Sequence, residues 1–148
     1  MIYMWEFELF EEGEFVNAFP VEGLDGGTCA YSVEEAVEYA YDWLTMVVDD
    51  ALMSGKELPK PYFDAKPQHD GMMVVIAVSR DLDQIPAMTA AEAARELGIS
   101  SARVSQLVKS GALESWMSGT RRMISKASVE SRKAEMPKPG RPKNLRSA

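Results

Sequence analysis

The side chains able to support catalysis are few and scattered in this 148-residue sequence. It has one histidine, His69, and one cysteine, Cys29, so it has neither a triad pattern nor enough ligands for a Cys/His zinc site. We interpret His69 as a loop histidine and Cys29 as a small buried thiol. The sequence therefore favours a protein that is not an enzyme and uses no metal and no cofactor.

Carboxylates offer one alternative. Glu6 and Glu8 share one face of a strand predicted over residues 2–10, and Asp49 and Asp50 stand near the end of a predicted helix. Two-metal cleavage of a phosphodiester needs carboxylates that converge on ions about 3.5 to 4 Å apart. Alternation of the strand predicts that its apolar residues face the core and that Glu6 and Glu8 point to solvent. A residual nuclease stays open, to be tested by metal-dependent cleavage after replacement of both residues.

Groups suited to reading nucleic acid cluster later in the sequence. A helix predicted over residues 101–109 turns Val104, Leu107 and Val108 inward and leaves small, amide and cationic side chains outside. An exposed Gln106 can pair with an adenine edge, and Arg103 or Lys109 can reach phosphates or guanine. The candidate DNA-contacting residues of this helix are Ser101, Ala102, Arg103, Ser105, Gln106 and Lys109.

The elements before this helix favour a sharp helix-turn-helix. Thr89 and Glu92 have the spacing of a capping box, which opens a helix over residues 90–97, and Gly98 ends it. Ser100 can then cap the second helix, while the small Ala94 permits the two helices to cross closely. The alternative is a helical hairpin whose polar face is only solvated.

A β-hairpin is predicted next, over residues 113–124, with its turn at Ser118-Gly119-Thr120. Together with the two helices, residues 88–132 resemble the winged helix-turn-helix of the excisionase and MerR type. The resemblance implies that Arg121 and Arg122, which leave the turn, contact phosphates or the minor groove. Ser125 can cap a last helix that ends near Lys133.

The tail contains Gly140-Arg141-Pro142 between lysines, and it looks like an AT-hook. Arg141 is then the candidate for insertion into a narrow A·T minor groove. A plain basic tail, disordered on its own, is the other interpretation.

Charge divides the chain. Residues 1–88 hold 18 Asp and Glu against 4 Lys and Arg, a net −14, whereas residues 89–148 hold 5 against 12, a net +7, which together give the total of −7. Such asymmetry predicts two modules with different partners, the basic one suited to a polyanion. The alternative is one domain with a basic tail.

The acidic half reads as strands over residues 2–10, 15–19 and 28–31, followed by a long helix. Ser32 begins that helix with a capping box to Glu35, and its apolar stripe ends near Gly55. Residues 58–67 are proline-rich and extended. The apolar run at residues 72–78 predicts a strand that is buried on both faces.

Residues 2–79 resemble the HicB antitoxin module. The resemblance rests on a hairpin ending in Phe19-Pro20, the helix entry at residues 33–40, the motif Gly-x-x-Leu-Pro-x-Pro at residues 55–61 and a terminal apolar strand. It implies a truncated RNase H-like β-β-β-α-β fold that covers a small basic HicA-like, RNA-cleaving toxin. The turn at residues 20–27 departs from the family pattern. An acidic helix face would attract such a partner, and its residues are Glu34, Glu38, Asp42, Asp49 and Asp50.

We therefore predict an α+β protein with a HicB-like domain at residues 1–80, a linker at 81–87, a winged helix-turn-helix at 88–134 and a basic tail at 135–148. Its predicted function is that of an antitoxin that binds its toxin and represses its own operon on double-stranded operator DNA, as a homodimer or homotetramer. The alternative is a stand-alone DNA-binding regulator whose first domain only oligomerises or senses a ligand. Without a membrane-length apolar run or a signal-like N-terminus, we expect a cytoplasmic protein with no membrane partner.

Overall fold

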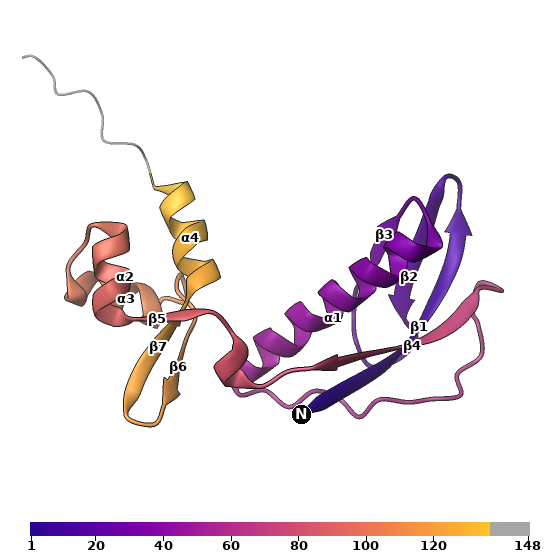
Figure 1. Cartoon of the computed structure of the whole chain (residues 1–148), viewed down its shortest axis with the longest axis horizontal. Helices are drawn as coiled ribbons and strands as arrows, with labels where there is room; N and C mark the ends of the chain where they lie inside the picture. The colour runs from indigo at the N-terminus through magenta and orange to yellow at the C-terminus, as the bar shows by residue number, and fades with distance from the viewer. Residues whose placement is uncertain (137–148) are drawn as a thin grey trace, which may run out of the picture. The chain divides into compact units, whose positions relative to one another are not determined.

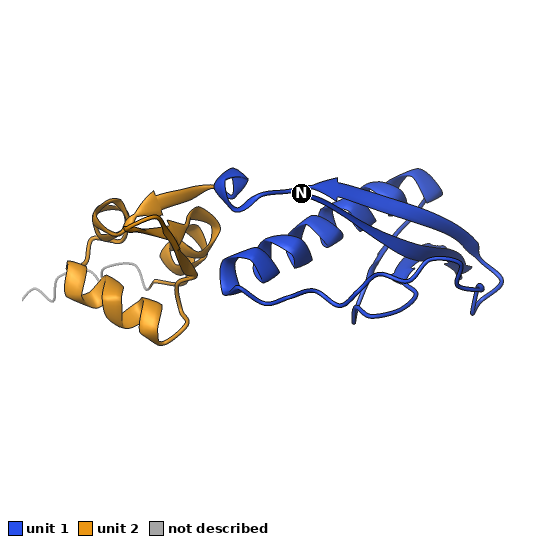
Figure 2. Cartoon of the chain, turned by 90° about the horizontal axis from the view of Figure 1, so that it is seen from below, with its two compact units in different colours: residues 1–85 blue, residues 86–148 orange. Residues whose placement is uncertain are grey.

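The structure is a computed structural model that describes residues 1–136. The chain forms two compact units, residues 1–85 and residues 86–148 (Figure 2). No helix among the described residues is long and apolar enough to cross a membrane.

The first unit is a four-stranded antiparallel sheet with one long helix across one face (Figure 1). Its strands lie in the order β3-β2-β1-β4. The order β-β-β-α-β agrees with the sequence prediction, and a short 3-10 helix follows β4. The elements are β1 (Ile2–Glu12), β2 (Phe15–Pro20), β3 (Thr28–Ala30), α1 (Val33–Ser54), β4 (Met72–Ser79) and η1 (Leu82–Gln84).

Helix α1 begins and ends where the sequence predicted. The Ser32 hydroxyl accepts the Glu35 N–H at 3.2 Å, and Gly55 ends the helix with a left-handed φ of 68°. The face of α1 that meets the sheet carries small or aliphatic buried residues, which allow the helix to pack closely on the sheet. The core that results contains Trp5, Phe7, Leu9, Val16, Ala18, Ala30, Ala36, Ala40, Leu44, Val48, Ile76 and Val78.

The prediction that Glu6 and Glu8 point to solvent is wrong, because both are buried, with exposures of 7% and 3%. The loop between α1 and β4 folds back over the outer face of β1. The N–H groups of Gln68 and His69 each donate to Glu8 oxygens at 2.8 to 3.0 Å. The carboxylates therefore satisfy the main chain of a proline-rich loop that lacks a sheet partner.

Two further predictions are wrong. Strand β4 is not buried on both faces, because it is an edge strand whose outer-face residues, such as Val75, are exposed. Cys29 is exposed rather than buried, because it lies in the short edge strand β3.

In the second unit, the described residues form three helices around a small antiparallel sheet of order β5-β7-β6. Its core is formed by residues from these helices, from β7 and, at Leu113, from the loop between α3 and β6. Strand β5 was not predicted, because its three residues give no alternation long enough to read. The elements are β5 (Ala87–Thr89), α2 (Ala90–Leu97), α3 (Ser101–Lys109), β6 (Ser115–Ser118), β7 (Arg121–Ser125) and α4 (Lys126–Glu135).

Candidate nucleic-acid interface

The turn between α2 and α3 is held by caps on both sides. The Glu92 N–H donates to the Thr89 hydroxyl at 3.2 Å, and the Thr89 N–H donates back to the Glu92 carboxylate at 2.7 Å. Gly98 ends α2 with a φ of 63°, which costs glycine little. The Ser100 hydroxyl then accepts the Arg103 N–H at 3.1 Å and starts α3. The backbone therefore changes direction within two residues.

Helix α3 docks through one face and presents the other to solvent. Val104 and Leu107 are buried against the core of the unit, as predicted, while Val108 is half-buried. All six candidate residues on α3 are exposed: Ser101, Ala102, Arg103, Ser105, Gln106 and Lys109. The structure thus gathers them on one accessible surface of a short helix, the geometry that enters a major groove.

Two of these residues are already coupled. Arg103 donates from Nη1 to Oε1 of Gln106 at 3.0 Å. The bond orients the Gln106 amide, whose NH₂ group stays available as a donor. Recognition of adenine by glutamine uses the amide oxygen and the amide NH₂ together. Arg103 therefore contacts the same Gln106 amide that would hydrogen-bond to a base.

The wing is the hairpin of β6 and β7, which turns at Gly119 with a φ of 62° (Figure 1). Arg121 pairs with Ser118 and Arg122 pairs with Met117, so the two arginines are neighbours on one strand. Their side chains therefore point to opposite faces of the hairpin. Both are exposed, and Arg122 donates from Nη1 to the Ser115 hydroxyl at 2.9 Å.

Electrostatics link the wing to the start of α2. The pKa of Glu92 lies below its ordinary value, first because its carboxylate accepts the Thr89 N–H and then because of its hydrogen bond with the Thr89 side chain. The positive charges of Arg95 and Arg121 lower it further, by smaller amounts. Arg121 therefore lies within electrostatic range of the capping box, on the side of the wing away from Arg122. The last candidate, Arg141, lies outside the described residues.

The acidic residues predicted to contact a toxin lie along α1. Glu34, Glu38, Asp42 and Asp50 are exposed, and the first three recur at four-residue steps along one stripe. Asp49 differs, because Arg80 donates to its two oxygens at 2.6 and 2.8 Å. That contact raises the pKa of Arg80 through the hydrogen bond with Asp49. Asp49 thus ties α1 to the end of β4.

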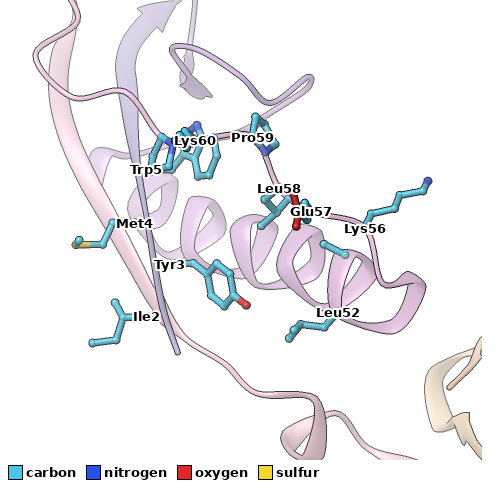
Figure 3. Close-up of a pocket in the computed structure, with 12 residues that line it drawn as sticks. Ile2, Tyr3, Met4, Trp5, Leu52, Lys56, Glu57, Leu58, Pro59 and Lys60 are labelled. Atoms are coloured by element: carbon cyan, nitrogen blue, oxygen red, sulfur yellow. The ribbon is translucent and has the colours of Figure 1, made fainter. Parts of the chain in front are cut away.

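A cleft of about 490 Å³ is a feature that sequence reasoning missed (Figure 3). It opens between the start of β1, the end of α1 and residues 56–61, with Tyr3, Leu52 and Leu58 among its apolar lining. Lys56, Glu57 and Lys60 supply charges around it. The Gly-x-x-Leu-Pro-x-Pro motif at residues 55–61 was the available signal, since it forms one wall.

The nuclease alternative assumed that Glu6 and Glu8 point to solvent, and the structure shows other surroundings for both. Glu6 accepts the N–H groups of Asp64 and Ala65, each at 3.0 Å, and Glu8 accepts those of Gln68 and His69. The oxygens of both carboxylates therefore accept hydrogen bonds from main-chain N–H groups. Within residues 1–136, no group of three or more His, Cys, Asp or Glu side chains is arranged to hold a metal ion.

Comparison with known families identifies the second unit. Residues 87–136 match the family described as a helix-turn-helix domain. No curated protein and no solved structure matches the chain. The match supports a helix-turn-helix domain at residues 87–136, and the class of protein that such a domain suggests is a DNA-binding regulator.

Proposed function

We propose that the protein regulates transcription by binding operator DNA, with α3 in the major groove and the β6–β7 wing against the backbone. The observation that carries the proposal is the exposed polar face of α3, on a helix-turn-helix domain in a basic half of the chain. Gln106 and Arg103 supply hydrogen-bonding groups for base edges, and Lys109 supplies a cation for phosphates.

Fluorescence anisotropy with the full chain tests this proposal. A mixed-sequence duplex of about 30 base pairs accommodates two half-sites one helical turn apart. We expect affinity to fall steeply with salt, and selection from a random duplex library to return a preferred sequence. Gln106→Ala should flatten that preference, whereas Lys126→Ala, a cation on α4, should retain it. Absence of binding in dilute buffer would contradict the proposal.

We propose further that the first unit has a truncated RNase H-like fold and covers a small basic RNA-cleaving toxin, so that the chain is the antitoxin of a HicA/HicB-like pair that represses its own operon. The β-β-β-α-β order and the resemblance of residues 2–79 to the HicB module support this. The exposed acidic stripe of Glu34, Glu38 and Asp42 supports a basic partner. No catalysis by the chain itself is implied.

Co-expression with the product of the neighbouring gene tests the antitoxin proposal. We expect a small basic protein to copurify, and charge reversal at Glu34, Glu38 and Asp42 to slow its association. Glu14→Lys, in the exposed β1–β2 turn, is the matched control. If the neighbouring gene encodes no such protein and none copurifies, the antitoxin proposal fails while the DNA-binding proposal stands.

A second candidate is a stand-alone regulator whose first unit oligomerises or senses a ligand. The apolar cleft beside the start of β1 favours it, since ligand sites are concave and mostly apolar with a few polar groups. Operator binding by the purified chain that responds to a small molecule, and to no partner protein, would select this candidate over the antitoxin.

A further inference from the structure

Strand β4 has a free edge that lacks the residues which usually prevent strand pairing. In the sheet order β3-β2-β1-β4 it pairs with β1 on one side and with no other strand among the described residues. Its sequence, MMVVIAVS, contains no charged residue and no proline. Natural edge strands usually carry such residues to prevent pairing with another chain. The free edge of β4 is therefore suited to accept a strand.

The backbone parity of β4 is fixed by two hydrogen bonds. The Arg80 N–H donates to the Met1 carbonyl at 2.9 Å, so alternate residues before Arg80 direct their polar groups toward β1. The Val21 N–H donates to the Glu6 carbonyl at 3.0 Å, so Glu6, opposite Val75, turns away from β4. Both bonds show that the even-numbered residues of β4 direct their backbone N–H and C=O groups toward β1 and that the odd-numbered residues direct theirs away from it. The residues whose N–H and C=O groups point to the free edge are Met73, Val75, Ala77 and Ser79.

Apolar side chains lie beside this edge on the outer face of the sheet. Ile2, Met4 and Val75 are 66%, 45% and 52% exposed. Met4 pairs with Ala77, so the exposed side chains of β1 and β4 are adjacent. Figure 3 shows Ile2 and Met4 on the side of β1 away from Tyr3. The edge thus combines unpaired backbone groups with an apolar surface, as strand-addition sites do.

We propose that β4 pairs antiparallel with β4 of a second copy of this chain. The two-fold axis passes between Ile76 of one copy and Ile76 of the other. This register places Met73 opposite Ser79 of the second copy and Val75 opposite Ala77 of the second copy. Every outward N–H and C=O of β4 then finds a partner, because each of these residues belongs to a hydrogen-bonded pair. The product is one continuous sheet with both α1 helices on the same face.

A second copy fits this edge better than a different protein. The register is self-complementary, which an isologous two-fold contact requires. The strand is uncharged although residues 1–88 carry a net −14, so two copies meet there without placing like charges opposite each other. The inference also rests on the proposed function, since two helix-turn-helix units on one dimer can occupy two half-sites.

Sedimentation velocity of the full chain over a wide concentration range tests the proposal. We expect a dimer, weakened about tenfold or more by Val75→Lys, which brings two lysines close across the axis. Val75→Pro should act similarly, because it removes an outward N–H that β1 does not use. Met46→Lys adds the same charge at an exposed apolar residue of α1 and should leave the dimer unchanged.

The register has its own test. The double variant Val75→Lys with Ala77→Glu places opposite charges across the interface and should restore the dimer. Hydrogen exchange on the wild-type chain needs no variant: the amides of Met73, Val75 and Ala77 should be protected at high concentration and exchange fast at low concentration. A monomeric wild type, or a dimer untouched by both Val75 variants, would overturn the proposal.

Failure of the β4 dimer proposal can be distinguished from failure of the proposed function. If the wild-type chain forms a dimer but binds no duplex, the β4 interface is supported and the operator proposal fails. A chain that binds duplex DNA while sedimenting as a monomer does the reverse.

Discussion

Arg103 and Gln106 lie one turn apart on the exposed face of α3, joined by a hydrogen bond of 3.0 Å from Nη1 to Oε1. The bond holds the Gln106 amide before any DNA is present, which reduces the side-chain entropy lost on binding. We therefore expect the two residues to act as a unit in recognition.

Replacement of either residue should affect the same base pair. Gln106→Ala should relax sequence preference at one position by about 1 to 3 kcal/mol, and Arg103→Ala should relax the same position in part. In a double-mutant cycle the two effects should not add, because the residues are in contact. Anisotropy titrations on the selected duplex and its single-base variants measure this, with Lys109→Ala as a control that weakens all sequences alike. Additive losses at separate positions would show that the contact has no role in recognition.

The two wing arginines should differ in their effect on binding. They point to opposite faces of the hairpin, and Ser115 already holds Arg122 through a hydrogen bond of 2.9 Å. We expect Arg121→Ala to lower affinity for all sequences and reduce the slope of log affinity against log salt by about 1, the value for one lost phosphate contact. Arg122→Ala should leave the slope nearly unchanged. Equal slopes for both variants would mean that the wing contacts DNA through its tip instead of one face.

The local signals of the sequence predicted most of the elements, because their causes lie within a few residues. Ser32, Ser100 and the Thr89–Glu92 pair cap the helices that they were expected to cap, and Gly98 makes the turn. The burial of Glu8 could not be predicted from such local signals. Alternation correctly placed it on the face away from α1, yet a loop about 60 residues later in the sequence covers that face.

The edge position of β4 was missed for a related reason. An apolar run of this length suits a strand covered on both faces or an edge strand that awaits a partner, and periodicity does not separate the two. For the site, the exposed face of α3 followed from helical periodicity alone. The apolar cleft requires β1, α1 and residues 56–61 together, so the Gly-x-x-Leu-Pro-x-Pro motif, which forms one wall, does not by itself predict a cleft.

Glu8 should contribute strongly to the stability of the first unit. Glu8→Gln keeps the size of the side chain but replaces one acceptor oxygen with an NH₂ group, which faces the N–H groups of Gln68 and His69. The free energy of unfolding should fall by about 2 to 3 kcal/mol, because buried donors lose a charged partner. Urea denaturation followed by circular dichroism measures the loss. Glu14→Gln, in the exposed turn, should change stability by less than about 0.5 kcal/mol, and equal losses would refute a specific role for Glu8.

The capping box at Thr89 and Glu92 makes the second unit sensitive to acid. The pKa of Glu92 in the folded chain lies below its ordinary value of 4.5, so its contribution to stability is complete above pH 4.5 and is lost as the pH falls through the lowered pKa. Glu92→Gln should remove that part of the pH dependence, because the amide cannot titrate. Melting curves between pH 3 and pH 6 test this, and Glu114→Gln, outside the capping box, is the control. Parallel profiles for wild type and Glu92→Gln would contradict the assignment.

Asp49 should behave differently from its neighbours on the acidic face of α1. Its two oxygens accept from Arg80, and the side chains of Asp49 and Arg80 are only 18% and 23% exposed. A paired, partly shielded contact of this kind is worth more than a surface ion pair, so Asp49→Asn should lower the free energy of unfolding by about 1 to 2 kcal/mol. Glu38→Gln, at an exposed position on the same helix, should leave stability unchanged. If a basic partner binds this face, Glu38→Gln should instead slow its association, and Asp49→Asn should affect binding only as far as it unfolds the unit. Thermal melts paired with association kinetics separate the two roles, and a partner that loses affinity for folded Asp49→Asn would show that Asp49 is a contact residue as well as an anchor.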